Sequence, residues 1–119
     1  MDRRVNTVIT LMKNNLHRKI SLAEMTRAAQ LSPDHLREVF KAETGFAPVR
    51  YLKRLRLIRA KDLLRSSSLS VKEIAGQVGV SDISHFVREF QTACSITPTA
   101  YRKQHAAADT REPSREANP

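Results

Sequence analysis

Residues 21–53 read SLAEMTRAAQLSPDHLREVFKAETGFAPVRYLK, and residues 70–103 read SVKEIAGQVGVSDISHFVREFQTACSITPTAYRK. Matching residues lie 49 positions apart at the beginning of the two stretches, as at Ser21 and Ser70. They lie 50 positions apart further on, as at Phe40 and Phe90. Self-similarity at a fixed period is typical of a repeated structural unit. The sequence therefore predicts two copies of one unit, with one residue added in the second copy.

Each copy carries the signals of two short helices joined by a tight turn. Ser21 and Ser70 each precede a glutamate by three residues, which is the pattern of a capping box at a helix N-terminus. Ser32 and Ser81 are expected to cap the second helices. The sequence thus predicts two helix-turn-helix units, the first over about 21–44 and the second over about 70–93.

A longer helix is predicted to join the two units over about 48–65, and its apolar residues form two nearly opposite faces. One face holds Tyr51, Leu55 and Ile58, and the other holds Val49, Ala60, Leu63 and Leu64. A helix with two apolar faces needs neighbours on both sides, so we expect this helix to lie between the units.

The remaining segments complete an all-α fold. An amphipathic pattern over about 3–15 predicts an opening helix, and Pro98 is placed to begin a last one, which makes seven helices. No segment has the pattern of a strand. We therefore predict one domain over 1–105, and a disordered tail over 106–119, where periodicity is absent.

The charge of the chain favours a polyanionic partner. Lys and Arg number 21 against 12 Asp and Glu, a formal net charge of +9, and a small domain with that excess repels itself unless it meets a polyanion. A membrane is disfavoured because no apolar run approaches the ~20 residues that span a bilayer. The N-terminus lacks the apolar segment of a secretory signal. Cys94 is the single cysteine, which fits a reducing cytoplasm.

The sequence does not predict an enzyme. The four histidines share no metal-ligand spacing, and no nucleophile is accompanied by a recognisable base. We therefore expect no catalytic residue, no metal site and no cofactor.

A helix-turn-helix unit reads DNA with its second helix, which enters the major groove. The core-facing residues of these helices are predicted to be Leu36, Val39 and Phe40 in the first unit and Phe86, Phe90 and Ala93 in the second. The opposite faces supply candidates for reading base edges: Asp34, Arg37, Glu38 and Lys41 in the first, and Ser84, Val87, Arg88 and Gln91 in the second. Because the two sets differ, we expect an asymmetric bipartite site on double-stranded DNA, bound by a monomer.

The joining helix has the length and charge to hold the two reading helices on one DNA duplex. A helix of about eighteen residues is roughly 27 Å long, whereas successive major-groove segments on one face lie about 34 Å apart. Candidates for phosphate contacts are Arg50, Lys53, Arg54, Arg56 and Arg59 on this helix, with Ser32, His35, Ser81 and His85 at the starts of the reading helices.

The stretches LSPDHLREVFKAETGFAPVRYLKRLRLIRAKDLL and VKEIAGQVGVSDISHFVREFQTACSITPTAYRK resemble the DNA-binding domain of AraC/XylS-type bacterial transcription regulators. The resemblance runs from about Leu16 to Lys103. It implies seven helices, two helix-turn-helix units on a linker helix, and a role in regulating transcription. By motif position it adds Ile83 to the base-reading candidates, although core packing of Ile83 is an equal alternative. The chain departs from the family pattern at Gln30 and Ser95, where glycine is usual, and at Val80, where phenylalanine is usual.

Several alternatives stay open at this point. Arg37 lies beside Asp34 and Glu38 and can be held in a surface ion pair, so Arg88 is the stronger candidate for a guanine contact. A basic module that docks on RNA polymerase or another regulator is the alternative class of function. A stand-alone regulator and the C-terminal domain of a longer, ligand-sensing one fit the sequence equally.

Overall fold

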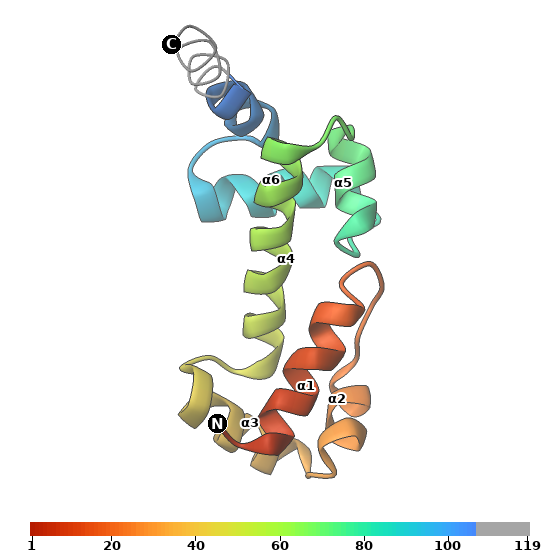
Figure 1. Ribbon diagram of the computed structural model, residues 1–119, viewed down its shortest axis with the longest axis vertical. Coiled ribbons are helices and arrows are strands. Elements are labelled where there is room, and N and C mark those ends of the chain that lie inside the picture. The colour runs from red at the N-terminus through yellow and green to blue at the C-terminus, as the bar shows by residue number, and fades with distance from the viewer. Residues whose placement is uncertain (107–119) are drawn as a thin grey trace, which may run out of the picture.

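The computed structural model describes residues 1–106, and these residues fold into helices joined by short turns (Figure 1). The helices are α1 (Arg3–Asn14), α2 (Leu22–Ala29), α3 (Pro33–Thr44), α4 (Pro48–Ser66), α5 (Val71–Gln77) and α6 (Ile83–Cys94). A seventh helical segment spans 98–106. No strand occurs in this described part, so the predicted all-α fold of seven helices is confirmed. The predicted tail lies, from residue 107 onward, outside the described residues.

The two units lie at opposite ends of α4, which runs along the long axis of the molecule (Figure 1). The molecule measures 56 × 35 × 22 Å along its principal axes. Each unit has a core of its own. The first core contains Val5, Val8, Ile9, Met12, Ile20, Met25, Ala29, Leu36, Phe40 and Leu52. The second contains Ala60, Leu63, Leu64, Ile74, Ala75, Val78, Phe86 and Phe90.

Each core has an aromatic pair at an equivalent position. Phe40 meets the ring of Tyr51 edge-on, with centroids 5.3 Å apart at an interplanar angle of 79°. Phe90 meets Tyr101 in the same way, at 5.6 Å and 76°. These pairs lie 50 positions apart in the sequence, so the repeat recurs in the packing of the two units.

The two apolar faces of α4 are used in succession along the helix. Tyr51, Leu52 and Leu55 pack on the first core, and from Leu57 onward α4 packs on the second. The assignment of Val49 and Ile58 to buried faces was wrong, since they are 52% and 57% exposed. Each unit covers only one end of α4, so apolar residues beyond its reach stay in solvent.

Two predicted helix caps differ from the structure. In the second unit the cap of α6 is Asp82 instead of Ser81, because the Asp82 carboxylate accepts from the backbone N–H groups of Ser84 and His85. The residue added in the second copy therefore lies in the turn before the cap. In the first unit Ser21 accepts from the Glu24 N–H, as predicted. Of the two predicted capping boxes, the one at Ser70 and Glu73 has its reciprocal half, whereas at Ser21 the Glu24 carboxylate binds Arg18 instead.

Two of the non-glycine departures lie at left-handed turns. Gln30 ends α2 with φ of 57°, and Ser95 ends α6 with φ of 70°. At the position that matches Ser95 in the first unit, α3 ends at Gly45 with φ of 85°. Ser95 therefore adopts a backbone conformation that glycine reaches without steric strain.

Candidate nucleic-acid interface

The exposed face of α3 presents charged side chains opposite its core residues. Leu36 and Phe40 are fully buried and Val39 is half-buried, as predicted. The base-reading candidates Asp34, Arg37, Glu38 and Lys41 are all exposed. Arg37 Nη1 donates to Asp34 Oδ1 at 3.1 Å, so the ion pair considered from the sequence is present. A nucleic acid that approaches this face has to compete with an exposed pair, and such pairs are weak.

The exposed face of α6 is less charged, and it carries an arginine without a partner. Ser84, Arg88 and Gln91 are exposed, and Ile83 is 41% exposed. The guanidinium of Arg88 has no hydrogen-bond or ion-pair partner within residues 1–106, in contrast to Arg37. Arg88 is therefore free to present a two-pronged donor to a base edge.

The two reading helices bury equivalent central positions but differ at the flanks of their core-facing sides. Val87 is half-buried against the second core, whereas its repeat equivalent Arg37 is exposed. Conversely, Glu89 is exposed and its equivalent Val39 is half-buried. The prediction of Ala93 as a core residue was wrong, since Ala93 is exposed. The outward faces of α3 and α6 therefore do not match residue for residue, and the transfer of contact positions from one unit to the other does not hold at Val87.

Four of the basic candidates on α4 lie at the surface: Arg50, Lys53, Arg54 and Arg59. Arg54 stacks over the ring of Phe46, with its guanidinium carbon 4.6 Å from the ring centroid. Arg59 pairs with Asp62 at 3.2 Å. Arg50 has no partner among the described residues, so it keeps its full capacity for a phosphate.

A groove of about 740 Å³ runs between α4 and α6 beside the reading face of α6. Arg50, Lys53 and Arg54 line it from α4, while His85 and Glu89 line it from α6. Sequence reasoning missed Glu89, which lies 3.4 Å from Lys53 and 3.6 Å from His85. The spacing of four residues between His85 and Glu89 on one helix was the available signal. The groove thus carries basic side chains from α4, and one carboxylate of α6 lies between Lys53 and His85.

The remaining candidates differ in how far they are free to meet phosphate. Ser32, Ser81, His35 and His85 are exposed near the first turns of α3 and α6. Ser32 also accepts from the His35 N–H at 3.3 Å. Arg56 is the exception, since its Nη2 donates to the carbonyl oxygen of Arg18 at 2.6 Å and its Nε is buried. Burial lowers the pKa of this guanidinium. Arg56 therefore uses part of its guanidinium on a contact within the protein, and it also lines the groove between α4 and α6.

Other kinds of site find no support in the described chain. Residues 1–106 contain no group of three or more His, Cys, Asp or Glu side chains arranged to hold a metal ion. Within the same residues, none of the helices combines the length and the apolar character that crossing a bilayer requires.

The second helices of the two units, α3 and α6, have exposed faces and lie at the two ends of the basic helix α4. This arrangement defines a protein with two helix-turn-helix units. A family model described as a helix-turn-helix domain matches residues 25–104. The transcriptional activator RhaR of Mannheimia succiniciproducens is 35% identical over 101 residues, which are 85% of this chain and 37% of that protein. The chain belongs to the AraC-type helix-turn-helix family of DNA-binding domains.

Solved structures agree with this assignment. The DNA-binding domain of AdpA, determined in complex with a target DNA, has a TM-score of 0.83 and 28% identity, covering 94% of this chain and 98% of that one. A transcriptional regulator of Chromobacterium violaceum, described as AraC-type, has a TM-score of 0.79 and 30% identity over 87% of this chain and 92% of that one. The chain spans little more than a third of the length of the RhaR relative.

Proposed function

We propose that this protein binds an asymmetric site on double-stranded DNA as a monomer and thereby regulates the initiation of transcription. In this proposal α3 reads one half-site and α6 reads the other, about one helical turn away. The observation that carries the proposal is the pair of unlike exposed faces held at opposite ends of α4. A helix of 19 residues is about 28 Å long, close to the ~34 Å between successive major-groove segments.

The two reading helices are expected to contribute unequally. Arg88 has no partner among the described residues, and a bidentate arginine–guanine contact discriminates against a wrong base by ~1–3 kcal/mol. The exposed ion pair between Arg37 and Asp34 is weak, but the carboxylates of Asp34 and Glu38 are unfavourable near phosphates. We therefore assign the stronger base preference to the half-site under α6. In α3, Lys41 and the released Arg37 supply the attraction.

Phosphate contacts are assigned to exposed basic residues beside the reading helices. The candidates are Arg50, Lys53, Arg54 and Arg59 on α4 and His35 and His85 at the helix starts. Their contribution is independent of sequence and weakens with salt. Two related proteins support DNA binding and a role in transcription: RhaR is a transcriptional activator, and the structure of the AdpA domain was determined in complex with a target DNA.

The proposal is tested by selecting sequences from a randomised pool of duplex DNA at near-physiological salt. Two unlike half-sites about one turn apart are expected. Selection with the Arg88→Ala variant is the matched experiment, and it should lose the base preference at one position while keeping the other half-site. A palindromic motif would contradict the monomer. An unenriched pool would contradict sequence-specific binding and favour docking on a protein such as RNA polymerase.

A further inference from the structure

The helix α4 passes from one unit to the other within a single helical turn. Leu55 packs on the first core and Leu57 packs on the second, so the helix changes partners between these residues. Arg56 occupies the position between them. The apolar cores of the two units are separate clusters. Polar contacts at this turn of α4 can therefore decide how the second unit is oriented relative to the first.

Arg56 reaches from α4 to the loop that joins α1 and α2. Its Nη2 donates to the Arg18 carbonyl oxygen at 2.6 Å, and its Nε is buried with no partner among residues 1–106. A buried, charged donor that lost its acceptor would be left uncompensated. The contact therefore favours one position of the loop relative to α4.

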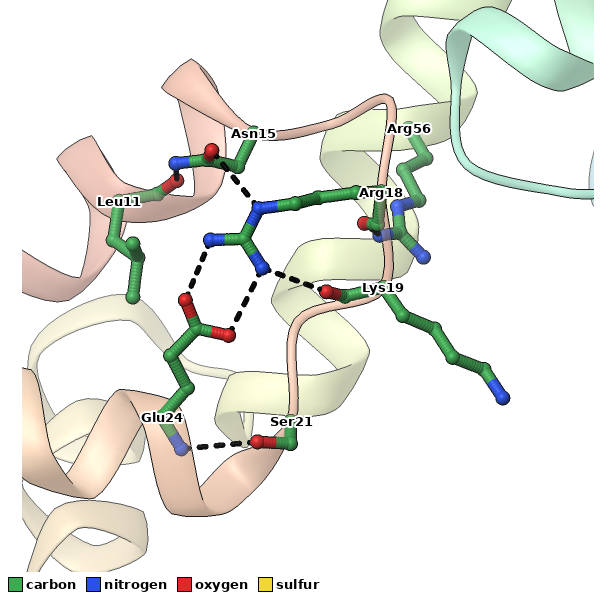
Figure 2. Close-up of polar contacts among 7 residues, drawn as sticks. All are labelled: Leu11, Asn15, Arg18, Lys19, Ser21, Glu24 and Arg56. Atoms are coloured by element: carbon green, nitrogen blue, oxygen red, sulfur yellow. Dashed lines mark hydrogen bonds and ion pairs between the residues drawn. The ribbon is translucent and has the colours of Figure 1, made fainter.

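The loop itself is held by a network centred on Arg18, which Figure 2 shows between α1 and α2. Arg18 Nε donates to the side chain of Asn15 at 3.1 Å, and its Nη1 donates to the Lys19 carbonyl at 2.9 Å. The same guanidinium makes a bidentate pair with Glu24, at 3.0 and 2.5 Å. Asn15 donates in turn to the Leu11 carbonyl on α1 at 2.8 Å. The loop is thus fixed to both α1 and α2.

The second unit touches the same loop from the other side. Figure 1 shows the α1–α2 loop beside the end of α5. There, Gly79 approaches so closely that a Cβ atom would lie 2.6 Å from the Leu16 carbonyl oxygen and 3.1 Å from Arg56 Nη2. Its φ of 78° also favours glycine. The loop, Arg56 and Gly79 therefore form one contact between the units, which we call the junction.

We propose that Arg56 is a positioning residue that fixes the orientation of the second unit relative to the first, and thereby sets the DNA half-site spacing that the protein accepts. This inference rests on the bipartite binding proposed above. One extra base pair between the half-sites moves the second by about 3.4 Å and rotates it by about 35°. A rigid junction cannot follow that movement without losing contacts in one half-site.

The first test measures orientation without DNA. Ala42 and Thr92 are exposed, equivalent positions on α3 and α6, and each is replaced by cysteine to carry a spin label. Cys94 is replaced by serine so that only these two positions are labelled. Double electron–electron resonance should give a narrow distribution of distances between the two labels. Arg56→Met should broaden it, and Gly79→Ala should shift its mean because the new Cβ pushes against the loop. Arg65→Met is the control, since Arg65 is an exposed arginine on the same helix whose side chain pairs with Asp62.

The second test measures the spacing preference on the site recovered by selection. One inserted base pair should weaken wild-type binding at least about fivefold, the lower end of the loss from one mismatched pair. In Arg56→Met the penalty should fall below twofold, whereas Arg65→Met should keep the wild-type penalty. A residue that merely stabilises the fold would lower the melting temperature without changing this ratio.

The proposal is overturned by a distance distribution or a spacing penalty in Arg56→Met that equals the wild-type value. If that variant does not fold, Gly79→Ala carries both measurements, and an unchanged mean distance in it has the same consequence. Failure of the proposed function is a separate result: no site would be selected, while the DNA-free distances would still decide the role of Arg56.

Discussion

Replacing Ser95 by glycine should stabilise the second unit by about 1 kcal/mol. Ser95 has φ of 70° and ψ of 0°, and this left-handed conformation costs an L-residue roughly 1–2 kcal/mol. Glycine removes that strain but gives back about 0.4–1 kcal/mol through the greater freedom of the unfolded chain. The Ser95 N–H bond to the Gln91 carbonyl, at 2.8 Å, is available to glycine as well. The Ser95 hydroxyl has no hydrogen-bond partner among residues 1–106.

The assay is thermal and urea unfolding followed by circular dichroism. A gain of 1 kcal/mol raises the melting temperature of a domain of this size by about 4–8 °C, and the urea m-value should not change. Gly45→Ser is the reciprocal control, because Gly45 is the equivalent cap of α3 and a Cβ there would meet nothing within 4 Å. That variant should lose a similar amount from backbone strain alone.

The reasoning is refuted if Ser95→Gly leaves the melting temperature unchanged or lowers it while its helix content is retained. A neutral Gly45→Ser would refute it independently, because both substitutions test the same left-handed cap. If the two units unfold separately, only the transition of the second unit should move in Ser95→Gly.

Three further predictions follow from the contacts described above. Asp82→Ala should destabilise the protein by about 1 kcal/mol through loss of the α6 cap, whereas Ser81→Ala should have little effect; equal losses on urea unfolding would contradict the assignment of the cap. The hydrogen bond from Arg18 lowers the pKa of Glu24 below its ordinary 4.5. Stabilisation by this pair is therefore complete above that value and declines as pH falls through the lowered pKa. In an acid titration, the free energy of unfolding of Glu24→Gln should fall less steeply than that of the wild type. Arg88→Ala should weaken the selected site more than random DNA, whereas Arg50→Ala should weaken both alike and reduce the salt slope by about one unit; equal loss on both DNAs for Arg88→Ala would remove its base-reading role.

Much of the fold was predictable because its signals are local. Ser21, Ser70 and Pro33 occupy the helix starts that their chemistry predicts, and the periodicity of Leu36 and Phe40 identifies a buried face. The repeat added a second, independent copy of each signal. These features depend on neighbours three or four residues away, which a sequence displays directly.

The errors concern choices that depend on the tertiary structure. Glu24 had two partners within reach, and Arg18 binds its carboxylate through a loop whose path the sequence does not display. Ile58 fits an apolar face by spacing, but neither unit extends far enough to cover it. Among the basic residues of α4, Arg56 lies four residues after Leu52 and four before Ala60, and this register on a buried stripe was the available signal for its inward position. Exposure of this kind is decided by where the two units meet.

The separation of the two cores has a consequence for binding strength. In the proposed bipartite binding, engagement of one reading helix holds the other near its half-site at an effective concentration set by α4 and the junction, so the second binding event is intramolecular. Residues in separate cores share few partners, and the energetic effects of substitutions in α3 and α6 should therefore add. Two weak half-sites can then make one strong site through geometry alone, and either half can change its preferred bases without altering the avidity that the connection provides.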